Sequence, residues 1–345
     1  MQQGIVIHAP HDLRVQELQT AELQPHQLKV KVKAGGICGS DLHYYHNGGF
    51  GTVRIKEPMV LGHEVSGVIA ETGAAISDIK AGTRISISPS NPCGLCKYCQ
   101  EGKHNHCLDM RFYGSAMRMP HVQGAFRQEI IIERAQAHIV ADHVSDGEAA
   151  MAEPLSVALH AVRRAGPLFG KRVLVTGCGP IGALTVIAAR RAGALQIVVT
   201  DVAKMPLESA LKVGADQAIN VAQDAEALKA FTPDKGTFDV LFEASGNEQA
   251  LRGALDTLRP GAVIVQVGLG GDINFPANLL VGKELEWRGA FRFHEEFALA
   301  VELMNRKLVD VKPLISATYP FEKSIEAFEV AGDRSKMMKV QLSFD

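Results

Sequence analysis

The chain has 345 residues, of which 46% are hydrophobic and 21% charged, with 33 glycines and a formal net charge of −2. This length favours two domains, and the composition is typical of a globular α/β protein. Because the charge is small and no block of Lys or Arg occurs, nothing favours a nucleic-acid partner. The longest uncharged stretch, residues 173–189, contains three glycines and a proline, so we expect no membrane span.

The N-terminal sequence MQQGIVIHAPHDLRV contains no apolar run behind basic residues. It therefore shows no secretory signal, and we expect a cytoplasmic protein.

Three short segments contain residue types that bind metals. GGICGSDLHYY supplies Cys38, LGHEVSG supplies His63 and Glu64, and AEPLSVALHA supplies Glu153. A cysteine, a histidine and a carboxylate would give zinc three protein ligands and an open position, as in catalytic zinc sites. Each residue also has an ordinary explanation, because a lone cysteine is usually a small buried residue and Glu-Pro often starts a helix.

Between the second and third segments, four cysteines lie within fifteen residues in PCGLCKYCQEGKHNHC. They are Cys93, Cys96, Cys99 and Cys107. Thiolates this close together can bind one tetrahedral Zn²⁺. Disulfides would need an oxidising compartment, and the fourth cysteine is wrongly spaced for a bacterial ferredoxin cluster. We predict a structural zinc in a lobe of about residues 89–112, called here the cysteine lobe.

The segment KRVLVTGCGPIG predicts a strand followed by a glycine-rich turn, Gly177-x-Gly179-x-x-Gly182, and a helix over 181–192. In this context the turn binds the pyrophosphate of a dinucleotide at the helix N-terminus.

A second strand, 196–200, ends in Asp201. A carboxylate there accepts hydrogen bonds from the ribose hydroxyls and repels a 2′-phosphate, so NAD is expected over NADP. Lys204 softens that preference and leaves NADP as a second cofactor. The alternative interpretation of Asp201 is a helix N-cap.

Further strand–helix units follow at DQAINV, FDVLFEASG and GAVIVQVGLGG. Strands that alternate with helices predict an α/β fold with a doubly wound parallel sheet.

These segments together resemble the zinc-dependent medium-chain dehydrogenases over almost the whole chain. The polyol branch is the most similar, because Glu153 stands where the alcohol branch has a second cysteine. DMRFYGSAM, PHVQGAF, GAFRFHEEF and AGDRSKMMKVQL are similar to the subgroup that oxidises the sugar acid L-idonate at C5.

The resemblance implies a mostly-β, GroES-like catalytic domain formed by residues 1–153 and 288–345. It implies a Rossmann domain at 154–287. It also implies a homo-oligomer, a dimer or a tetramer, in which the region of residues 275–280 pairs subunits.

The resemblance further implies two zinc ions per chain. Cys38 and His63 would bind the catalytic zinc with Glu153, while Glu64 would be an exchange ligand. Asp41 would orient His63, although a turn-capping aspartate is the alternative.

Ser40 and His43 are implied as a relay that carries the substrate's proton to solvent, although a surface histidine is the alternative for His43. The implied dinucleotide contacts come from the glycine-rich turn and the second strand: Gly177, Gly179, Pro180, Ile181, Gly182 and Asp201.

The substrate is expected to be a sugar acid or polyol that contacts Tyr44 and Arg292. Phe293 stands where the sorbitol enzymes usually have tyrosine, so one polar contact is lost. Arg111 or Arg118 is a candidate for binding a carboxylate, and each is equally readable as a solvated surface arginine.

Four alternatives remain beside the sugar-acid enzyme. A neutral-polyol dehydrogenase is the first, and a threonine dehydrogenase-like enzyme comes after it. A zinc-free quinone reductase-like enzyme and a non-enzymatic dinucleotide-binding relative are disfavoured, because the chain keeps Cys38, His63 and the relay residues.

Overall fold

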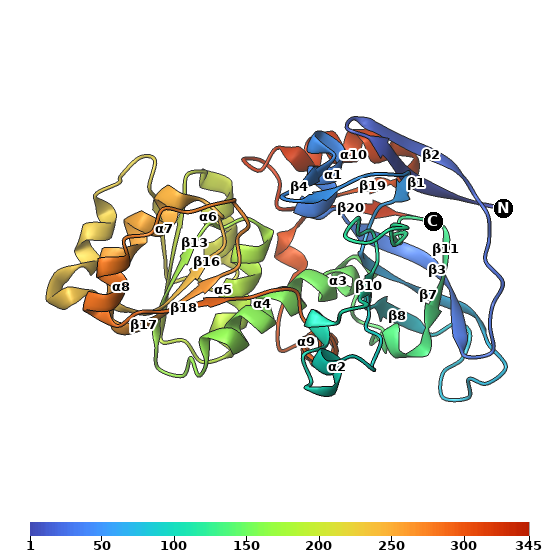
Figure 1. Cartoon of the computed structure of the whole chain (residues 1–345), viewed down its shortest axis with the longest axis horizontal. Coiled ribbons are helices and arrows are strands. Elements are labelled where there is room, and N and C mark those ends of the chain that lie inside the picture. Colours follow the sequence, from blue (N-terminus) through green and yellow to red (C-terminus); the bar gives the residue numbers. More distant parts are fainter. Residues whose placement is uncertain (345) are drawn as a thin grey trace.

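The computed structural model describes residues 1–344, and β3 (Gln27–Gly36) lies at the centre of its largest sheet, which is antiparallel except for one pair of strands (Figure 1). Buried Leu28, Val30 and Val32 recur at every second position, the period of a strand with one face in the core. One edge of β3 pairs with β7 (Glu64–Thr72). The other edge pairs with β11 (Glu129–Glu133) and then with the C-terminal strand β20 (Lys339–Ser343).

This sheet therefore joins β3, from the first part of the chain, to the C-terminal strand β20. Its remaining strands are β8 (Arg84–Ile87), β12 (Ala137–Ile139) and β19 (Ile315–Pro320). The smaller sheets are formed by β1 (Gln2–Ala9), β2 (Asp12–Leu18) and β6 (Met59–Val60), and by β4 (Gly49–Phe50) and β5 (Val53–Arg54). The helices of this half are α1 (Gly39–Asn47), α3 (Asp146–Ala150) and α10 (Ser324–Gly332).

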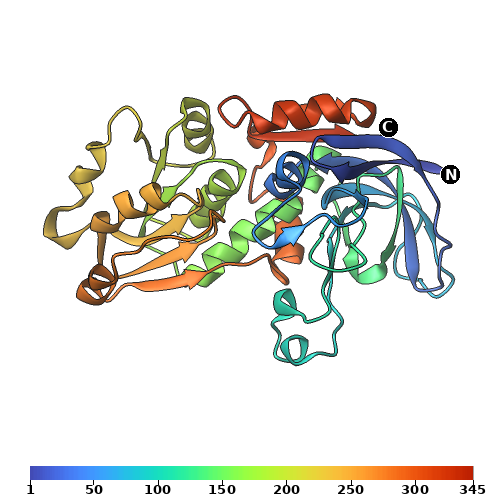
Figure 2. The same cartoon turned by 45° about the horizontal axis from the view of Figure 1, so that its top comes forward.

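The cysteine lobe projects from this half, as the turned view in Figure 2 shows. A two-stranded pair closes its base, β9 (Ser90–Asn91) with β10 (Arg111–Phe112). The lobe contains the short helices α2 (Lys97–Gln100) and η1 (His104–His106).

Within the described residues, six parallel strands form the second large sheet, in the order β15-β14-β13-β16-β17-β18. Numbered along the chain this is 3-2-1-4-5-6, the Rossmann order. The strands are β13 (Arg172–Thr176), β14 (Gln196–Asp201), β15 (Gln217–Asn220), β16 (Phe238–Glu243), β17 (Leu258–Gln266) and β18 (Glu286–Gly289). The helices are α5 (Pro180–Arg191), α6 (Lys204–Lys212), α7 (Glu248–Ala254) and α8 (Ala277–Lys283). The expected α/β fold with a GroES-like half and a Rossmann half is confirmed.

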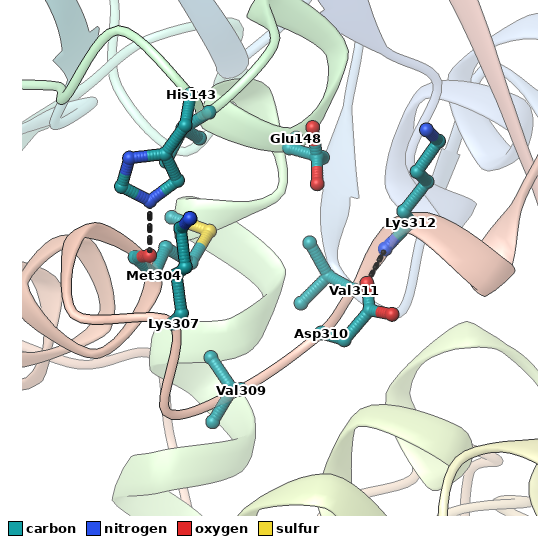
Figure 3. Close-up of a pocket in the computed structure, with 9 residues that line it drawn as sticks. His143, Glu148, Met304, Lys307, Val309, Asp310, Val311 and Lys312 are labelled. Carbon is teal, nitrogen blue, oxygen red and sulfur yellow. Dashed lines mark hydrogen bonds between the residues drawn. The ribbon is translucent and has the colours of Figure 1, made fainter.

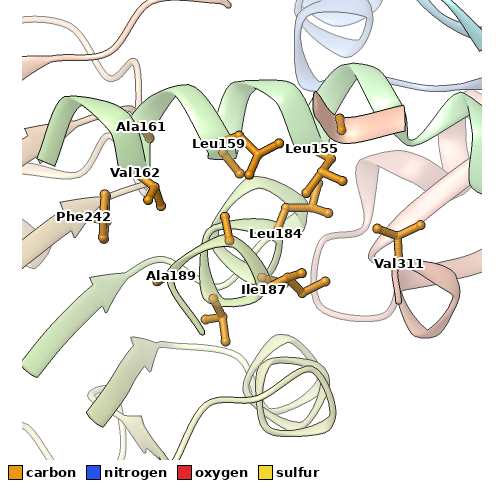
Figure 4. Packing of buried hydrophobic residues seen from close by; sticks show 14 of the residues in the cluster. Leu155, Leu159, Ala161, Val162, Leu184, Ile187, Ala189, Phe242 and Val311 are labelled. Carbon is orange, nitrogen blue, oxygen red and sulfur yellow. The ribbon is translucent and has the colours of Figure 1, made fainter. Parts of the chain in front are cut away.

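Two helices join the halves, α4 (Ala152–Ala165) and α9 (Glu296–Asn305). Buried Leu155, Leu159 and Val162 of α4 pack toward Leu184 and Ile187 of α5 (Figure 4). Burial of each such side chain stabilises the fold by about 1.5–3 kcal/mol. This packing fixes the start of α4, where Glu153 lies.

The remaining single turns are 3₁₀ helices: η2 (Arg134–Gln136), η3 (Ala227–Phe231), η4 (Pro233–Lys235), η5 (Leu255–Thr257), η6 (Lys312–Leu314) and η7 (Phe321–Lys323). Among residues 1–344, no helix has the length and apolarity needed to cross a membrane.

Candidate functional site

The structure brings Cys38, His63 and Glu64 together, with one ligand atom of each within 4.8 Å of the others. Cys38 lies directly before α1, and His63 lies directly before β7. The pairing of β3 with β7 sets Gly36 opposite Glu64. A Cβ at Gly36 would lie 2.1 Å from Glu64 Oε2, so the missing side chain makes room for this carboxylate.

Asp41 fixes the position of both candidate ligands. Its Oδ2 accepts a hydrogen bond from the Cys38 backbone N–H at 3.0 Å, which caps α1, and its Oδ1 accepts one from Gly62 N–H at 3.3 Å. The same Oδ1 lies 3.8 Å from His63 Nδ1, within ion-pair distance but too far for a hydrogen bond. Asp41 is therefore both a turn-capping residue and a close neighbour of His63.

Sequence reasoning missed Lys339, a fully enclosed cation beside this cluster. Its Nζ donates to Glu64 Oε1 at 2.8 Å, to Glu64 Oε2 at 2.7 Å and to the Ile37 carbonyl at 3.1 Å. Although burial lowers the pKa of Lys339, the charges of Glu64 and Cys38 outweigh it and raise that pKa. Lys339 lies in the segment AGDRSKMMKVQL, which the sequence analysis singled out. Nothing in the sequence predicts that this segment pairs with β3, and it is this pairing that brings Lys339 to Glu64.

Glu153 lies outside the tight group of Cys38, His63 and Glu64 but interacts electrostatically with all three. Burial raises the pKa of Glu153 to about 8, with attraction to His63 opposing it and repulsion from Glu64 and Cys38 adding to it. Burial and the charge of Glu64 also raise the pKa of Cys38 to about 12. Buried anionic donors that converge in this way fit a divalent cation, which would stabilise their charged forms.

His63 adds a second indication that a metal fits this site. Its Nδ1 is buried and has no hydrogen-bond partner in the part of the chain that the structure describes. The distances favour Glu64 as the third ligand, whereas the two hydrogen bonds from Lys339 occupy the oxygens of Glu64 and leave Glu153 the freer carboxylate.

Ser40 and His43 both lie on α1, directly after Cys38. His43 is half-buried, and its ring lies 5.9 Å from that of Phe50. Burial lowers the pKa of His43, and nearby Arg334 and His46 lower it further. A histidine kept neutral in this way can accept a proton near neutral pH.

Arg292 comes from the C-terminal tail and lies within electrostatic range of Glu153 and Tyr44. Its guanidinium stands 4.1 Å from the ring centre of Phe112, and burial lowers the pKa of Arg292 to about 10. The buried Tyr44 hydroxyl accepts a hydrogen bond from Ala116 N–H at 3.0 Å. These contacts place a cation and a phenol beside the candidate metal ligands.

The other residues considered for the substrate differ in position. Phe293 is fully buried, with its ring 5.7 Å from Phe297 and 6.3 Å from Phe112. Arg118 is paired with Asp109, and Arg111 is exposed on β10.

In the cysteine lobe, the ligand atoms of Cys93, Cys96, Cys99 and Cys107 all lie within 4.8 Å of one another. The Sγ atoms of Cys93 and Cys107 are 3.4 Å apart, and those of Cys96 and Cys99 are 3.6 Å apart. Four thiolates on one tetrahedral zinc are about 3.8 Å apart, so the spacing fits zinc. Hydrogen bonds from backbone groups, Leu108 first, lower the pKa of Cys96 to about 6, which favours the thiolate.

The glycine-rich turn has the geometry of a phosphate cradle. Gly177 has φ +82°, and a Cβ there would lie 2.8 Å from Ser245. A Cβ at Gly182 would lie 1.9 Å from the Gly177 carbonyl, so glycine allows the helix to pack on the turn. Gly179 faces open space within 4 Å, which leaves room for a ligand. Pro180 begins α5, where it needs no hydrogen-bond partner, and Ile181 follows it.

Asp201 closes β14 and anchors the turn. Its Oδ2 accepts a hydrogen bond from Cys178 N–H at 2.7 Å, and its Oδ1 accepts one from Ala203 N–H at 2.9 Å. The N-cap of α6 is Ala203, so Asp201 is not a helix N-cap.

A cavity of about 350 Å³ lies elsewhere, between residues 143–148 and 304–312 (Figure 3). Its lining includes Lys307 and Lys312 together with Glu148 and Asp310, and no candidate site residue lines it. The candidate site is therefore the cluster around Cys38, which is chosen for the chemistry of its side chains and not for the size of a cavity.

Two family models match the chain. The alcohol dehydrogenase GroES-like domain matches residues 24–142, and the zinc-binding dehydrogenase domain matches residues 180–306.

Relatives that match over almost the whole length of the chain are dehydrogenases as well. The chain is 43% identical over 343 residues to L-idonate 5-dehydrogenase (NAD(P)⁺) of Escherichia coli, covering 99% of this chain and 98% of the relative. It is 37% identical over 330 residues to sorbitol dehydrogenase of Bacillus subtilis, covering 94% and 92%. The crystal structure of L-idonate 5-dehydrogenase from Escherichia coli superposes with a TM-score of 0.95 at 42% identity, covering 99% of this chain and 98% of that one.

Proposed function

The chain belongs to the zinc-binding, GroES-like alcohol dehydrogenase family, and from this premise we propose that it is an L-idonate 5-dehydrogenase. In this reaction the C5 hydroxyl of L-idonate loses its proton, and the hydrogen on C5 leaves as a hydride to NAD(P)⁺. The products are 5-keto-D-gluconate, NAD(P)H and a proton. The observation that carries the proposal is the end-to-end identity of 43% together with the cluster of Cys38, His63 and Glu64.

Cys38, His63 and Glu153 are the proposed resting ligands of a catalytic zinc, and Glu64 is the proposed exchange ligand. When bound, this zinc acts as a Lewis acid that lowers the pKa of the substrate hydroxyl. The bonds from Lys339 to both oxygens of Glu64 support Glu64 as the ligand held in reserve. Asp41 holds the Cys38 backbone and lies 3.8 Å from His63 Nδ1, where it helps to orient the imidazole.

Ser40 and His43 conduct the proton from the hydroxyl to solvent. Their place on α1, directly after Cys38, supports this role. The lowered pKa of His43 keeps its imidazole neutral and ready to accept a proton.

The substrate is bound by Arg292 and Tyr44, beside the apolar Phe293. The guanidinium of Arg292 gives bidentate hydrogen bonds to a carboxylate or to two hydroxyls. The pyrophosphate binds at Gly177, Gly179, Pro180, Ile181 and Gly182, and Asp201 binds the ribose, so that NAD is preferred and NADP is accepted.

The second zinc, held by the four cysteines, is structural. We assign 1–153 with 288–345 to the catalytic domain and 154–287 to the cofactor domain. The need for four reduced thiols supports a cytoplasmic location. A homo-oligomer, dimer or tetramer, forms along the outer edge of β18.

The test is to measure the formation of NAD(P)H by its absorbance with a panel of substrates. The panel consists of L-idonate, D-gluconate, D-sorbitol, xylitol, galactitol and L-threonine, each with NAD and with NADP. We expect the highest kcat/KM with L-idonate. An equal or higher value with D-sorbitol would replace the proposal by a neutral-polyol dehydrogenase, the activity named for the relative that is 37% identical.

A further inference from the structure

The cysteine lobe contacts the tail segment that carries Arg292. Buried Asn105 donates a hydrogen bond from Nδ2 to the Phe291 carbonyl at 2.9 Å. The ring of His104 stacks on that of His294 with 3.8 Å between centroids and 20° between planes. His106 stacks on Phe291 at 6.0 Å. The lobe thus holds the residues on both sides of Arg292.

Arg292 has a backbone conformation that needs such support. Its φ is +52°, in the left-handed region that side-chain-bearing residues rarely adopt. A residue in this region stays there only when its surroundings fix it. The Arg292 side chain also lies over Phe112 of β10, the strand that closes the lobe.

The residues that follow Arg292 are held by α9 and α4, not by the cysteine lobe alone. Glu296 accepts a hydrogen bond from His294 N–H at 2.9 Å and one from His160 of α4 at 3.0 Å. These bonds fix the backbone after Arg292, while the lobe contacts the Phe291 carbonyl and the His294 ring. The lobe contacts come from η1, which lies between Cys99 and Cys107. In Figure 1 the lobe, marked by α2, lies beside α9, the helix that follows this segment.

We infer that the cysteine lobe, through Asn105 and His104, positions Arg292 for substrate binding. The lobe's zinc is thereby coupled to substrate affinity as well as to stability. Asn105 and His104 are positioning residues, because they act through the backbone on either side of Arg292. The inference rests on the proposed function in one respect, the contact of Arg292 with the substrate.

Asn105→Asp tests this inference, because it keeps the shape of the side chain and replaces the donor by a charge that repels the Phe291 carbonyl. We expect KM for L-idonate to rise about 10-fold, while kcat and KM for NAD change less than about 3-fold. The matched control is Lys103→Ala, an exposed position in the same lobe that pairs with Glu101. The control should leave every constant unchanged.

Two readouts separate positioning from a general loss of structure. Zinc content and the thermal unfolding midpoint should stay near wild type in Asn105→Asp. Calorimetric titration of L-idonate into the enzyme saturated with NADH, in which no hydride can be accepted, should show the same 10-fold loss of affinity. If Asn105→Asp fails to fold, the pair His104→Leu and His104→Phe replaces it. His104→Leu should bind L-idonate more weakly than wild type, whereas His104→Phe keeps a ring that can stack on His294 and should bind it about as well as wild type.

The variant Arg292→Met decides what a negative result means. Combined with Asn105→Asp, it should bind L-idonate no more weakly than Arg292→Met alone. If Arg292→Met weakens binding but Asn105→Asp and His104→Leu do not, the coupling is wrong and the proposed function stands. If Arg292→Met binds L-idonate as tightly as wild type, both the substrate contact and the inference are overturned.

Discussion

At the scale of single residues, the most consequential contact joins Lys339 to Glu64. Both side chains are buried, with 3% and 0% of their surfaces exposed. Neither charge has access to water, so each depends on the other for stabilisation. Lys339 gives its side-chain hydrogen bonds to Glu64 and not to Cys38, His63 or Glu153, which leaves those three as donors for a zinc ion.

Lys339→Met should lower the free energy of unfolding by about 3–5 kcal/mol, because the Glu64 carboxylate stays buried without a partner. Urea denaturation measures the loss. The double variant Lys339→Met with Glu64→Gln should recover most of it, since the orphaned charge is gone. Lys336→Met, which breaks an exposed pair with Asp333, is the control and should change stability by less than about 1 kcal/mol. A wild-type midpoint for Lys339→Met would contradict the expectation.

The proposed proton relay through Ser40 and His43 gives a prediction about pH. Burial lowers the pKa of His43, so the imidazole is neutral and able to accept a proton even somewhat below its ordinary pKa of 6.5. His43→Gln should therefore lower kcat by roughly 100-fold near neutral pH. The deficit should shrink as pH rises, because hydroxide replaces the missing base.

The kcat of the His43→Gln variant is measured from about pH 6.5, the ordinary pKa of histidine, to about pH 10, near that of lysine. His26→Gln, at an exposed position directly before β3, is the control and should retain the wild-type profile. A deficit that is constant over the whole range would show that His43 has a role other than proton transfer.

At the scale of elements, the sequence predicted those features that are determined by residues close together in the chain. The expected helix 181–192 is α5 at 180–191, and the expected strand 196–200 is β14, because one strand–turn–helix unit is specified by neighbouring residues. The cysteine spacing likewise predicted a cluster that the structure shows within one loop. The contact of Lys339 with Glu64 spans 275 residues and that of Asn105 with Phe291 spans 186, and no periodic pattern carries such pairings.

Within residues 90–112 the buried apolar side chains are only Cys99, Cys107 and Phe112, so we expect the shape of the cysteine lobe to depend on metal. Cys99→Ser should reduce zinc content from two ions per chain to about one and lower the thermal midpoint by an amount on the order of 10 °C, because a structural zinc contributes folding free energy. Elemental analysis and calorimetric melting measure the two effects. The Cys99→Ser enzyme that remains folded should show a raised KM for L-idonate with a smaller change in kcat, because the lobe contacts the segment that carries Arg292. Unchanged metal content and midpoint would refute the structural zinc.

At the scale of the whole molecule, the site is assembled from distant parts of the chain. Cys38 comes from the N-terminal half, Glu153 from the helix joining the halves, and Arg292 and Lys339 from the tail. The nucleotide sheet stands apart from these groups and ends at β18 (Figure 1). Because the outer edge of β18 has no partner strand within residues 1–344, its backbone groups are free to pair with another chain.

The surface beside this edge is suited to association of two copies. Helix α8 has no buried residue, Val281 is 73% exposed, and Trp287 of β18 packs against Phe275 at 4.4 Å. We expect light scattering to give the mass of a dimer or tetramer for the wild-type chain. Val281→Lys should shift this mass toward the monomer at low concentration, because two like charges would meet at a symmetric interface. Leu195→Lys, at an exposed position before β14, should leave the mass unchanged. A monomeric wild type, or a Val281→Lys variant with the wild-type mass at every concentration, would show that this edge is not the subunit interface.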